Sequence, residues 1–182
     1  MSITAEHARE ILQDAELLYS AEQVQVALQH VAAHINAAMH DQHPLVLAVM
    51  GGAVIFSGQL LPLLDFPLDF DYVHVSRYGD ARHGGAMKWK VEPGEHVRGR
   101  VVLLLDDILD EGHTLKALHQ RVMALGAARC LSAVFADKQH GKAKPIHADF
   151  VGLEIPNRFV FGYGMDIQGA WRNLSAIYAI KE

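Results

Sequence analysis

The sequence predicts an α/β fold with a mostly parallel central sheet flanked by helices. Short, uniformly apolar segments, residues 44–50 and 101–105, are typical of strands buried on both faces. Segments with helical spacing follow them after short connections. Because alternating strands and helices build parallel sheets covered on both faces, we expect ligands to bind beyond the carboxyl ends of the strands.

The helices are predicted from apolar residues that recur three or four positions apart. Residues 21–40 show this spacing, and Ser20 with Gln23 provides a capping box at the start. A second helix is expected over residues 53–64. A third follows the central strand and its loop, and Gly126 is a candidate for its C-terminal cap.

The strands are predicted from apolar or alternating segments that end at glycine or polar residues. Residues 68–75 alternate with a period of two, as a half-buried strand does. The residues that follow, 76–90, contain several glycines and lack periodicity, so we expect a strand that leads into a long mobile loop. The other predicted extended segments are residues 44–50, 101–105, 129–136, 149–153, 158–161 and 176–180, with a loop over 106–113.

Composition restricts the classes of function. The 182 residues are 51% apolar and 20% charged, which suits one compact domain over residues 1–182. The net charge of −5 and the absence of long basic runs argue against nucleic acid and anionic membranes as partners. The one cysteine, Cys130, excludes an intramolecular disulfide. Since no apolar run is as long as a membrane span and no signal peptide is evident, we expect a cytoplasmic protein.

An acidic turn follows the central strand in the stretch VVLLLDDILDEGHTL, residues 101–115. Neighbouring carboxylates repel one another, so Asp106 and Asp107 indicate a site where a cation or hydrogen-bond donors arrive, such as magnesium or a sugar diol. The turn also presents backbone N–H groups at a helix N-terminus, where a phosphate fits, and Gly112 lets the backbone approach closely. The Walker and Rossmann glycine motifs are absent. These residues predict a site for phosphate plus ribose.

Simpler interpretations stay open for several residues. The acidic residues could form a solvated turn, although three acids there are costly without a ligand. His30 and His34 are four positions apart on the first helix, but no third ligand is spaced to join them, so we expect solvated side chains rather than a zinc site. The apolar stripe of residues 21–40 fits the core or a subunit contact equally well.

Five segments, in order along the chain, resemble a known family. The run LLLDDILDEGHT, residues 103–114, resembles the phosphoribosyl diphosphate (PRPP) signature of type I phosphoribosyltransferases. Together the segments are similar to the hypoxanthine-guanine phosphoribosyltransferases of purine salvage. They are VMGGAVIFSGQL, VHVSRYGD, RGRVVLLLDDILDEGHTL, DKQHGKA and DFVGLEIPNRFVFGYGMDIQGAWRNL.

This resemblance implies a fold and a reaction. The fold is the type I phosphoribosyltransferase fold, with a small hood built from the N- and C-terminal segments. A flexible lid would run from Ser76 to about Lys90 and include Arg77 and Tyr78. The reaction would transfer the phosphoribosyl group of PRPP to hypoxanthine or guanine, giving IMP or GMP and pyrophosphate. The resemblance also implies Mg²⁺ as cofactor and a homodimer or homotetramer.

The resemblance assigns roles to individual residues. Asp106 and Asp107 would hold the ribose hydroxyls and, with Asp166, the metal ion. Asp110 would be the general base near N7 of the purine. The loop around the 5′-phosphate would consist of Asp110, Glu111, Gly112, His113 and Thr114. The purine would meet Lys138 at O6, the stacked ring of Phe159 and the main chain of Val160; the pyrophosphate would meet Arg172 and the Met50–Gly51 peptide, which is often cis in this family.

The chemistry explains these residue types. Displacement of pyrophosphate from C1′ passes through an oxocarbenium-like state, so the leaving polyanion needs cations such as Mg²⁺ and Arg172, and a lid must exclude water. Lys138 can only donate, which favours a 6-oxopurine over adenine by an energy on the order of a few kcal/mol. Three positions depart from the family pattern: Glu111 with His113 in the phosphate loop, Arg77 and Met50. Arg77 stands where a serine usually precedes the tyrosine and adds a cation near the path of the pyrophosphate. Glu111 must point outward from a dianion, and Met50 leaves pyrophosphate binding to the backbone where many relatives have a basic residue or asparagine.

Two alternatives stay open. A regulatory protein on the same fold would sense PRPP or a nucleotide and act on a nucleic-acid partner without turnover, although the acidic charge balance disfavours such a partner. A phosphoribosyltransferase for xanthine or adenine is the nearer alternative.

Overall fold

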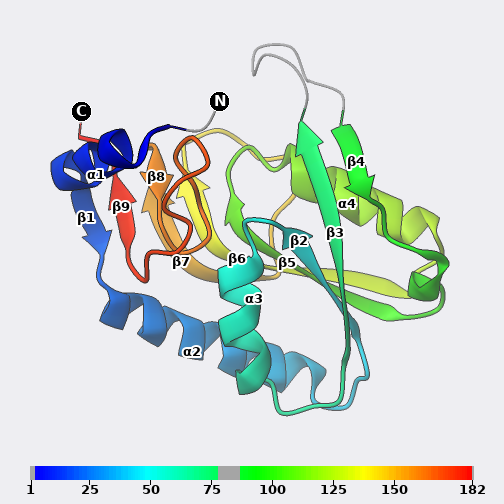
Figure 1. The fold of residues 1–182 in the computed structure, drawn as a ribbon. Coiled ribbons are helices and arrows are strands. Elements are labelled where there is room, and N and C mark those ends of the chain that lie inside the picture. Colours follow the sequence, from blue (N-terminus) through cyan, green and yellow to red (C-terminus); the bar gives the residue numbers. More distant parts are fainter. Residues whose placement is uncertain (1–2, 78–86, 182) are drawn as a thin grey trace.

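The computed structural model describes residues 3–77 and 87–181 and is built around a six-stranded sheet (Figure 1). The strand order is β4-β3-β2-β5-β6-β7. All neighbours pair in parallel except β3 and β4, which are antiparallel. The strands are β2 (Leu45–Met50), β3 (Asp69–Arg77), β4 (Met87–Val91), β5 (Val101–Leu109), β6 (Arg129–Gln139) and β7 (Phe150–Pro156). The predicted α/β class with a mostly parallel sheet is confirmed.

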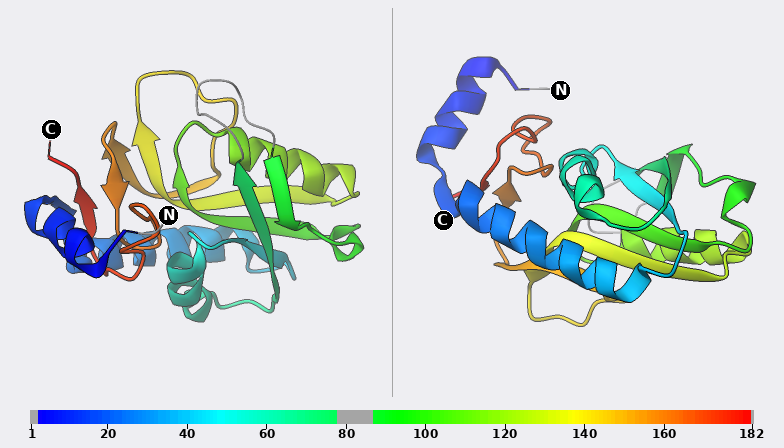
Figure 2. Two further views of the ribbon diagram at one scale, coloured as in Figure 1. Left: turned by 45° about the horizontal axis from the view of Figure 1, so that its top comes forward. Right: turned by 90° about the horizontal axis from the view of Figure 1, so that it is seen from below.

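Helices cover both faces of this sheet, as Figure 2 shows. On one face lie α2 (Ala21–Met39) and α3 (Val54–Leu60), the latter followed by the 3₁₀ turn η1 (Leu61–Leu63). On the other face lies α4 (His113–Ala124). A short 3₁₀ turn, η2 (Glu95–Val97), precedes β5. Each helix buries its apolar stripe against the strands, and the result is one apolar core on each side of the sheet.

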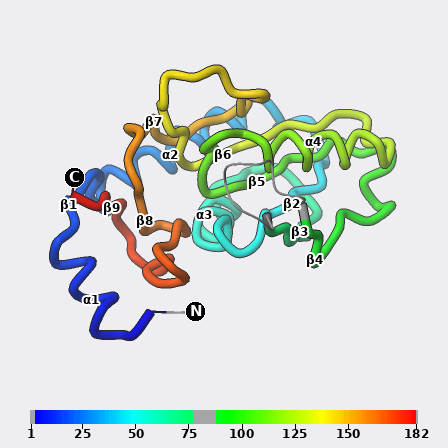
Figure 3. The backbone as a smooth tube through the Cα atoms, turned by 90° about the horizontal axis from the view of Figure 1, so that it is seen from above, coloured from blue at the N-terminus to red at the C-terminus, as the bar shows by residue number. Residues whose placement is uncertain are grey.

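A second, three-stranded sheet joins the two ends of the chain. Its order is β1-β9-β8 and both pairings are antiparallel. The strands are β1 (Glu16–Tyr19), β9 (Ile177–Ala179) and β8 (Val160–Phe161), and α1 (Ala5–Asp14) precedes β1. Figure 3 places this sheet at one end of the molecule, beside α2 and β7. The family resemblance predicts a hood from these same terminal segments.

The predicted helices are present, with differences at their ends. The helix at 21–40 is confirmed as α2, and the Ser20 side chain and Gln23 form the expected capping box. The helix predicted over residues 53–64 ends at Leu60. Pro62 lies in the 3₁₀ turn that follows, and it lacks the N–H that a continuing α-helix would need at this position. Gly126 adopts a positive φ of 91° directly after α4, as a C-terminal cap requires.

Two loop predictions were wrong at their edges. The central strand does not end at Leu105 but continues to Leu109, so Asp106 and Asp107 lie in β5 rather than in the loop. The reason is tertiary, because Asp106, Ile108 and Leu109 pair with β6, and this pairing outweighs the low strand propensity of aspartate.

The predicted loop over residues 76–90 is also shorter than expected, because β3 extends into its start and β4 occupies its end. Ser76 and Arg77 belong to β3 and residues 87–90 belong to β4, because the two strands pair antiparallel from Arg77↔Met87 onward. Tyr78 and the rest of residues 78–86 lie outside the described residues. Within the described part of the chain, no helix has both the length and the apolar character that crossing a membrane requires.

Candidate active site

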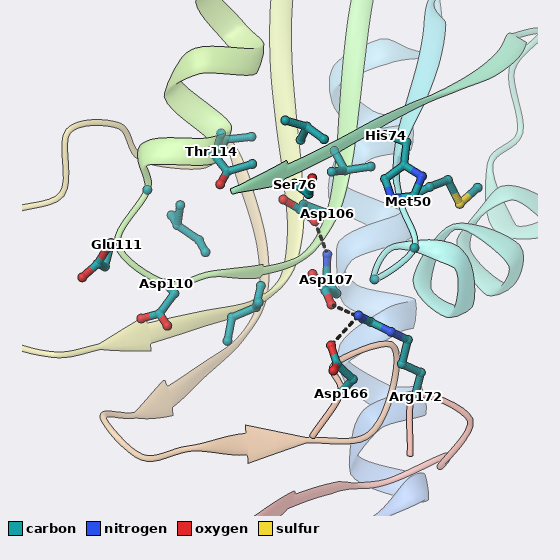
Figure 4. Close-up of a pocket in the computed structure, with 18 residues that line it drawn as sticks. Met50, His74, Ser76, Asp106, Asp107, Asp110, Glu111, Thr114, Asp166 and Arg172 are labelled. Atoms are coloured by element: carbon teal, nitrogen blue, oxygen red, sulfur yellow. Dashed lines mark hydrogen bonds and ion pairs between the residues drawn. The ribbon is translucent and has the colours of Figure 1, made fainter. Parts of the chain in front are cut away.

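A cavity of about 620 Å³ opens at the carboxyl ends of β2, β3 and β5. This is the edge of a parallel sheet where ligands bind. Figure 4 shows its lining, which comes from the strand ends, the loop before α4 and the segment after β8. The lining includes Met50, Gly51, Asp106, Asp107, Asp110, Glu111, Gly112, Thr114, Asp166 and Arg172. The structure therefore brings together most of the predicted phosphate, ribose and pyrophosphate residues; His113 faces a neighbouring cavity.

Asp106 and Asp107 form a buried acidic pair at the floor of this cavity. Each residue is only 8% exposed, and the Asp107 N–H donates to Asp106 Oδ1 at 3.0 Å. Burial raises the pKa of Asp106 well above its ordinary value, and the negative charge of Asp107 raises it further. Burial also raises the pKa of Asp107, against the opposing effects of its hydrogen bond with Asp106 and of the Arg172 charge. Such a pair is poised to accept a cation or hydroxyl donors.

Two glycines allow close packing around Asp107: Gly52 packs against its carboxylate, and Gly164 packs against the backbone of Gly52. A Cβ atom on Gly52 would lie 2.1 Å from Asp107 Oδ2, so a side chain at this position would displace the carboxylate. A Cβ atom on Gly164, whose φ is +100°, would lie 2.2 Å from the carbonyl oxygen of Gly52. Gly164 was not predicted as a site residue. The paired glycines at 51–52 were the only sequence signal for this close packing.

Arg172 bridges the acidic pair and Asp166 (Figure 4). One guanidinium nitrogen forms an ion pair with Asp166, and the other lies 3.8 Å from Asp107 Oδ2 and donates to the carbonyl of Gly164 at 2.5 Å. Asp166 Oδ2 also accepts a hydrogen bond from the backbone of Gly169 at 2.7 Å. The segment after β8 thus places the Arg172 guanidinium group beside Asp107, at the edge of the acidic pair.

The loop before α4 has the geometry of an anion site. Gly112 takes a φ of +82° and precedes the first helical residue, His113, and no side chain caps the helix. The amides of the first turn are therefore available to an external acceptor, and the helix dipole favours an anion there. In Figure 4 the Glu111 side chain points away from the Asp106–Asp107 pair.

A smaller cavity of about 200 Å³ continues from the first one. The two share Asp107, Ile108, Asp110 and Asp166 in their linings. On the far side of the smaller cavity lie the predicted purine residues Lys138, Phe159 and Val160, together with Met165. Lys138 Nζ donates to Asp110 Oδ2 at 2.9 Å, and the Phe159 ring is 54% exposed, so it offers a face to a planar ligand.

Comparisons with known proteins agree with this geometry. The sequence profile of the phosphoribosyl transferase domain family matches residues 14–168. The chain is 34% identical to the hypoxanthine-guanine phosphoribosyltransferase of Bacillus subtilis over 91% of its own length and 93% of that protein. It is 32% identical to the hypoxanthine-guanine-xanthine phosphoribosyltransferase of Tritrichomonas foetus, over 91% of each chain.

Solved structures show the same likeness. A hypoxanthine phosphoribosyltransferase from Staphylococcus aureus superposes with a TM-score of 0.87 at 26% identity, over 94% of this chain and 95% of that one. The chain belongs to the hypoxanthine-guanine phosphoribosyltransferase family. Its fold is accordingly the type I phosphoribosyltransferase fold that the resemblance implied.

The remaining family positions are placed as follows. The Met50–Gly51 peptide is cis, and both residues line the larger cavity. Ser76 also lines it, from β3. His74 was missed in the sequence, although it is the register partner of Met50 at the same sheet edge and its Nε2 lies 3.3 Å from Lys90 Nζ. The period-two pattern of residues 68–75 could have revealed it, because it ends at this edge.

A metal site is not built from the protein alone in the part of the chain that the structure describes. No group of three or more histidine, cysteine, aspartate or glutamate side chains there is arranged to hold a metal ion. Asp166 is engaged by Arg172 and Gly169 rather than grouped with Asp106 and Asp107.

Proposed function

We propose that this chain transfers the phosphoribosyl group of PRPP to a 6-oxopurine, hypoxanthine or guanine, and releases IMP or GMP and pyrophosphate. One observation carries this proposal. An uncapped helix N-terminus and a buried acidic pair line the larger cavity, and the Asp110–Lys138 pair lines the smaller cavity that joins it, so one continuous site has groups suited to the phosphate, the ribose and the purine of a nucleoside monophosphate. The family relationship supports the same reaction.

PRPP would bind in the larger cavity. The backbone amides from Asp110 to Thr114 would surround the 5′-phosphate, and the carboxylates of Asp106 and Asp107 would accept hydrogen bonds from the ribose hydroxyls. The pyrophosphate would lie toward Arg172 and the Met50–Gly51 peptide. To reach it, the guanidinium group would exchange its carboxylate partners, Asp166 and Asp107, for phosphate oxygens, which a guanidinium group can bind in a bidentate manner.

The donor set fits Mg²⁺. Two adjacent buried carboxylates with raised pKa values favour a hard cation that also binds substrate oxygens. Asp106 and Asp107 would hold Mg²⁺, and Asp166 is a further proposed ligand once Arg172 releases it. When bound, Mg²⁺ neutralises part of the charge on the leaving pyrophosphate.

The purine would occupy the smaller cavity. Phe159 would stack on the base, the Val160 main chain would contact its edge, and Lys138 would donate to O6. Asp110 would accept the proton from N7 as N9 of the purine attacks C1′ and pyrophosphate leaves. Because Lys138 donates to Asp110 in the free protein, O6 of the purine would take over the ammonium group and leave the carboxylate ready to act as a base.

A spectrophotometric assay tests the proposal. PRPP and Mg²⁺ are supplied with hypoxanthine, guanine, xanthine or adenine in turn, and we expect turnover of hypoxanthine or guanine. Asp110→Asn should lower kcat about 10²–10⁴-fold, the usual contribution of a general base. An unchanged kcat would remove Asp110 from that role.

The alternatives give different results in the same assay. If no purine is consumed while PRPP still raises the melting temperature, the chain is a sensor rather than an enzyme. If xanthine or adenine is preferred, the substrate assignment is wrong. We also expect a homodimer or homotetramer in the cytoplasm, and analytical ultracentrifugation determines the first point.

A further inference from the structure

A buried ion pair lies behind the proposed base. Lys144, in the loop after β6, has a side chain that is only 7% exposed, and its ammonium group pairs with the carboxylate of Asp137, which is 17% exposed. The same ammonium group donates to the carbonyl oxygen of Leu109 at 2.7 Å. A lysine is rarely buried to this extent without a specific partner. Here the partners are one carboxylate and one strand-end carbonyl.

Both partners directly precede a proposed reacting residue. Leu109 is followed by Asp110, and Asp137 is followed by Lys138. Leu109 and Asp137 are register partners at the end of the parallel β5–β6 pair, so one ammonium group holds the two main chains together at this point. One residue further along, the Asp110 carboxylate and the Lys138 ammonium group meet at 2.9 Å.

A second contact from the same loop acts on the same backbone. Nε2 of His140 lies 3.2 Å from the carbonyl oxygen of Asp110. The loop after β6 therefore contacts two successive carbonyls, those of Leu109 and Asp110, where β5 leads into the loop before α4. Lys144 is absent from the linings described for the two substrate cavities. Its influence on the reaction would pass through the backbone.

We propose that Lys144 is a positioning residue that, with Asp137, fixes the Asp110–Lys138 geometry from behind. The proposal rests on the proposed function for the roles of Asp110 and Lys138. Without the ammonium group, the Leu109 carbonyl would lose its donor and the Asp137 carboxylate would be left half-buried without its cation. The strand ends would then rearrange to expose both groups to water, and the base and the purine donor would shift relative to each other.

Steady-state kinetics of Lys144→Met tests this inference. We expect kcat for hypoxanthine to fall about 10–100-fold, since displacement of catalytic groups by about 1 Å has effects of this size. The KM for PRPP should change much less, because Lys144 touches neither the phosphate nor the ribose site. Lys144→Arg retains a cation that can pair with Asp137 and should recover part of the loss. Lys116→Met, which removes an exposed lysine from α4, is the matched control and should behave as wild type.

A double-mutant cycle separates positioning from a merely structural role. If Lys144 acts through Asp110, Lys144→Met combined with Asp110→Asn should be no slower than Asp110→Asn alone. Multiplying losses would contradict the proposal. Rates are normalised to the folded fraction from thermal melts, so that simple destabilisation does not count as lost catalysis.

Each outcome points to one conclusion. If Lys144→Met does not fold, Asp137→Asn keeps the volume of the side chain, removes only its charge and is expected to lower kcat in the same direction. If the wild-type protein turns over and both variants are as fast, the role of Lys144 is refuted while the proposed function stands. If the wild-type protein turns over no purine, the proposed function fails and the role of Lys144 fails with it.

Discussion

Asp106 and Asp110 are four residues apart in the sequence, yet their surroundings are opposite. Asp106 lies inside β5, is 8% exposed and has Asp107 as its charged neighbour, so burial and repulsion raise its pKa. The Asp110 side chain lies just beyond the strand, is 50% exposed and already pairs with Lys138. The buried pair has the Arg172 guanidinium 3.8 Å from Asp107 Oδ2, but this charge does not offset burial, and both pKa values stay raised. The exposed Asp110 carboxylate is paired directly with Lys138 and must be released from it before it can act as a base.

The two ends of the site, the Asp106–Asp107 pair and the Asp110–Lys138 pair, are therefore held in place by different interactions. The proposed ribose end is organised by packing, because Gly52 packs against the Asp107 carboxylate and Asp106 pairs with β6. The proposed purine end is held by the Asp110–Lys138 ion pair, which a substrate could replace. Substitutions at the first end should alter the site and the stability of the fold, while substitutions at the second should alter chemistry and specificity.

The largest expected effect comes from filling the space beside the buried pair. Gly52→Ala would place a Cβ atom 2.1 Å from Asp107 Oδ2, so the carboxylate must move away from the ribose. We expect kcat/KM for PRPP to fall roughly 10²-fold or more, as for other displaced site groups. Gly58→Ala in α3 is the control, because a Cβ atom there meets nothing within 4 Å. Wild-type kinetics in Gly52→Ala would break the claim that packing organises this end.

The next effect concerns the exchangeable ion pair. Lys138→Met removes the donor to O6 and the partner of Asp110. We expect the preference for hypoxanthine over adenine to shrink by about 10–100-fold, in line with the loss of one charged hydrogen bond. Measuring kcat/KM for both bases checks this, with Lys116→Met as the control. An unchanged ratio would show that Lys138 does not read the base.

A smaller effect is expected on the stability of the ligand-free protein. The pKa of Asp106 is raised in the folded state, so folding is favoured while Asp106 is protonated, and this stability is lost as the pH rises through that raised pKa. Asp106→Asn should remove this pH dependence and stabilise the protein at pH 8 by about 1–3 kcal/mol, the cost of a buried polar group without a partner. Urea unfolding in EDTA at pH 5 and pH 8 measures it, with exposed Asp41→Asn as control. Parallel pH slopes for wild type and Asp106→Asn would contradict the prediction.

The smallest effect is expected when the exposed carboxylate of Asp110 is removed and the stability of the fold is measured. Asp110→Asn should change the free energy of unfolding by about 0–1 kcal/mol, because the carboxylate is half exposed and its ion pair is screened by water. The same urea titrations at one pH suffice. A loss as large as several kcal/mol would mean that the purine end is as firmly built into the fold as the ribose end.

Several elements could be predicted from the sequence because their signals are local. The stripe and capping box of α2 depend on residues within a few turns, and so does the glycine turn before α4. The end of β5 could not be predicted in this way. Aspartate disfavours strands, and only the pairing with β6 keeps Asp106 and Asp107 extended. The same holds for Ser76 and Arg77, which the pairing with β4 draws into β3.

The sequence by itself determined the class of fold and the acidic cluster beside a glycine turn, because a buried strand, three aspartates and a glycine follow one another within fifteen residues. Only the tertiary structure decided how distant groups meet. Arg172 reaches Asp107, Lys138 reaches Asp110 and Lys144 reaches Leu109 through the order and register of strands far apart along the chain. Such contacts depend on the packing of the whole sheet, and no local pattern of residues specifies them.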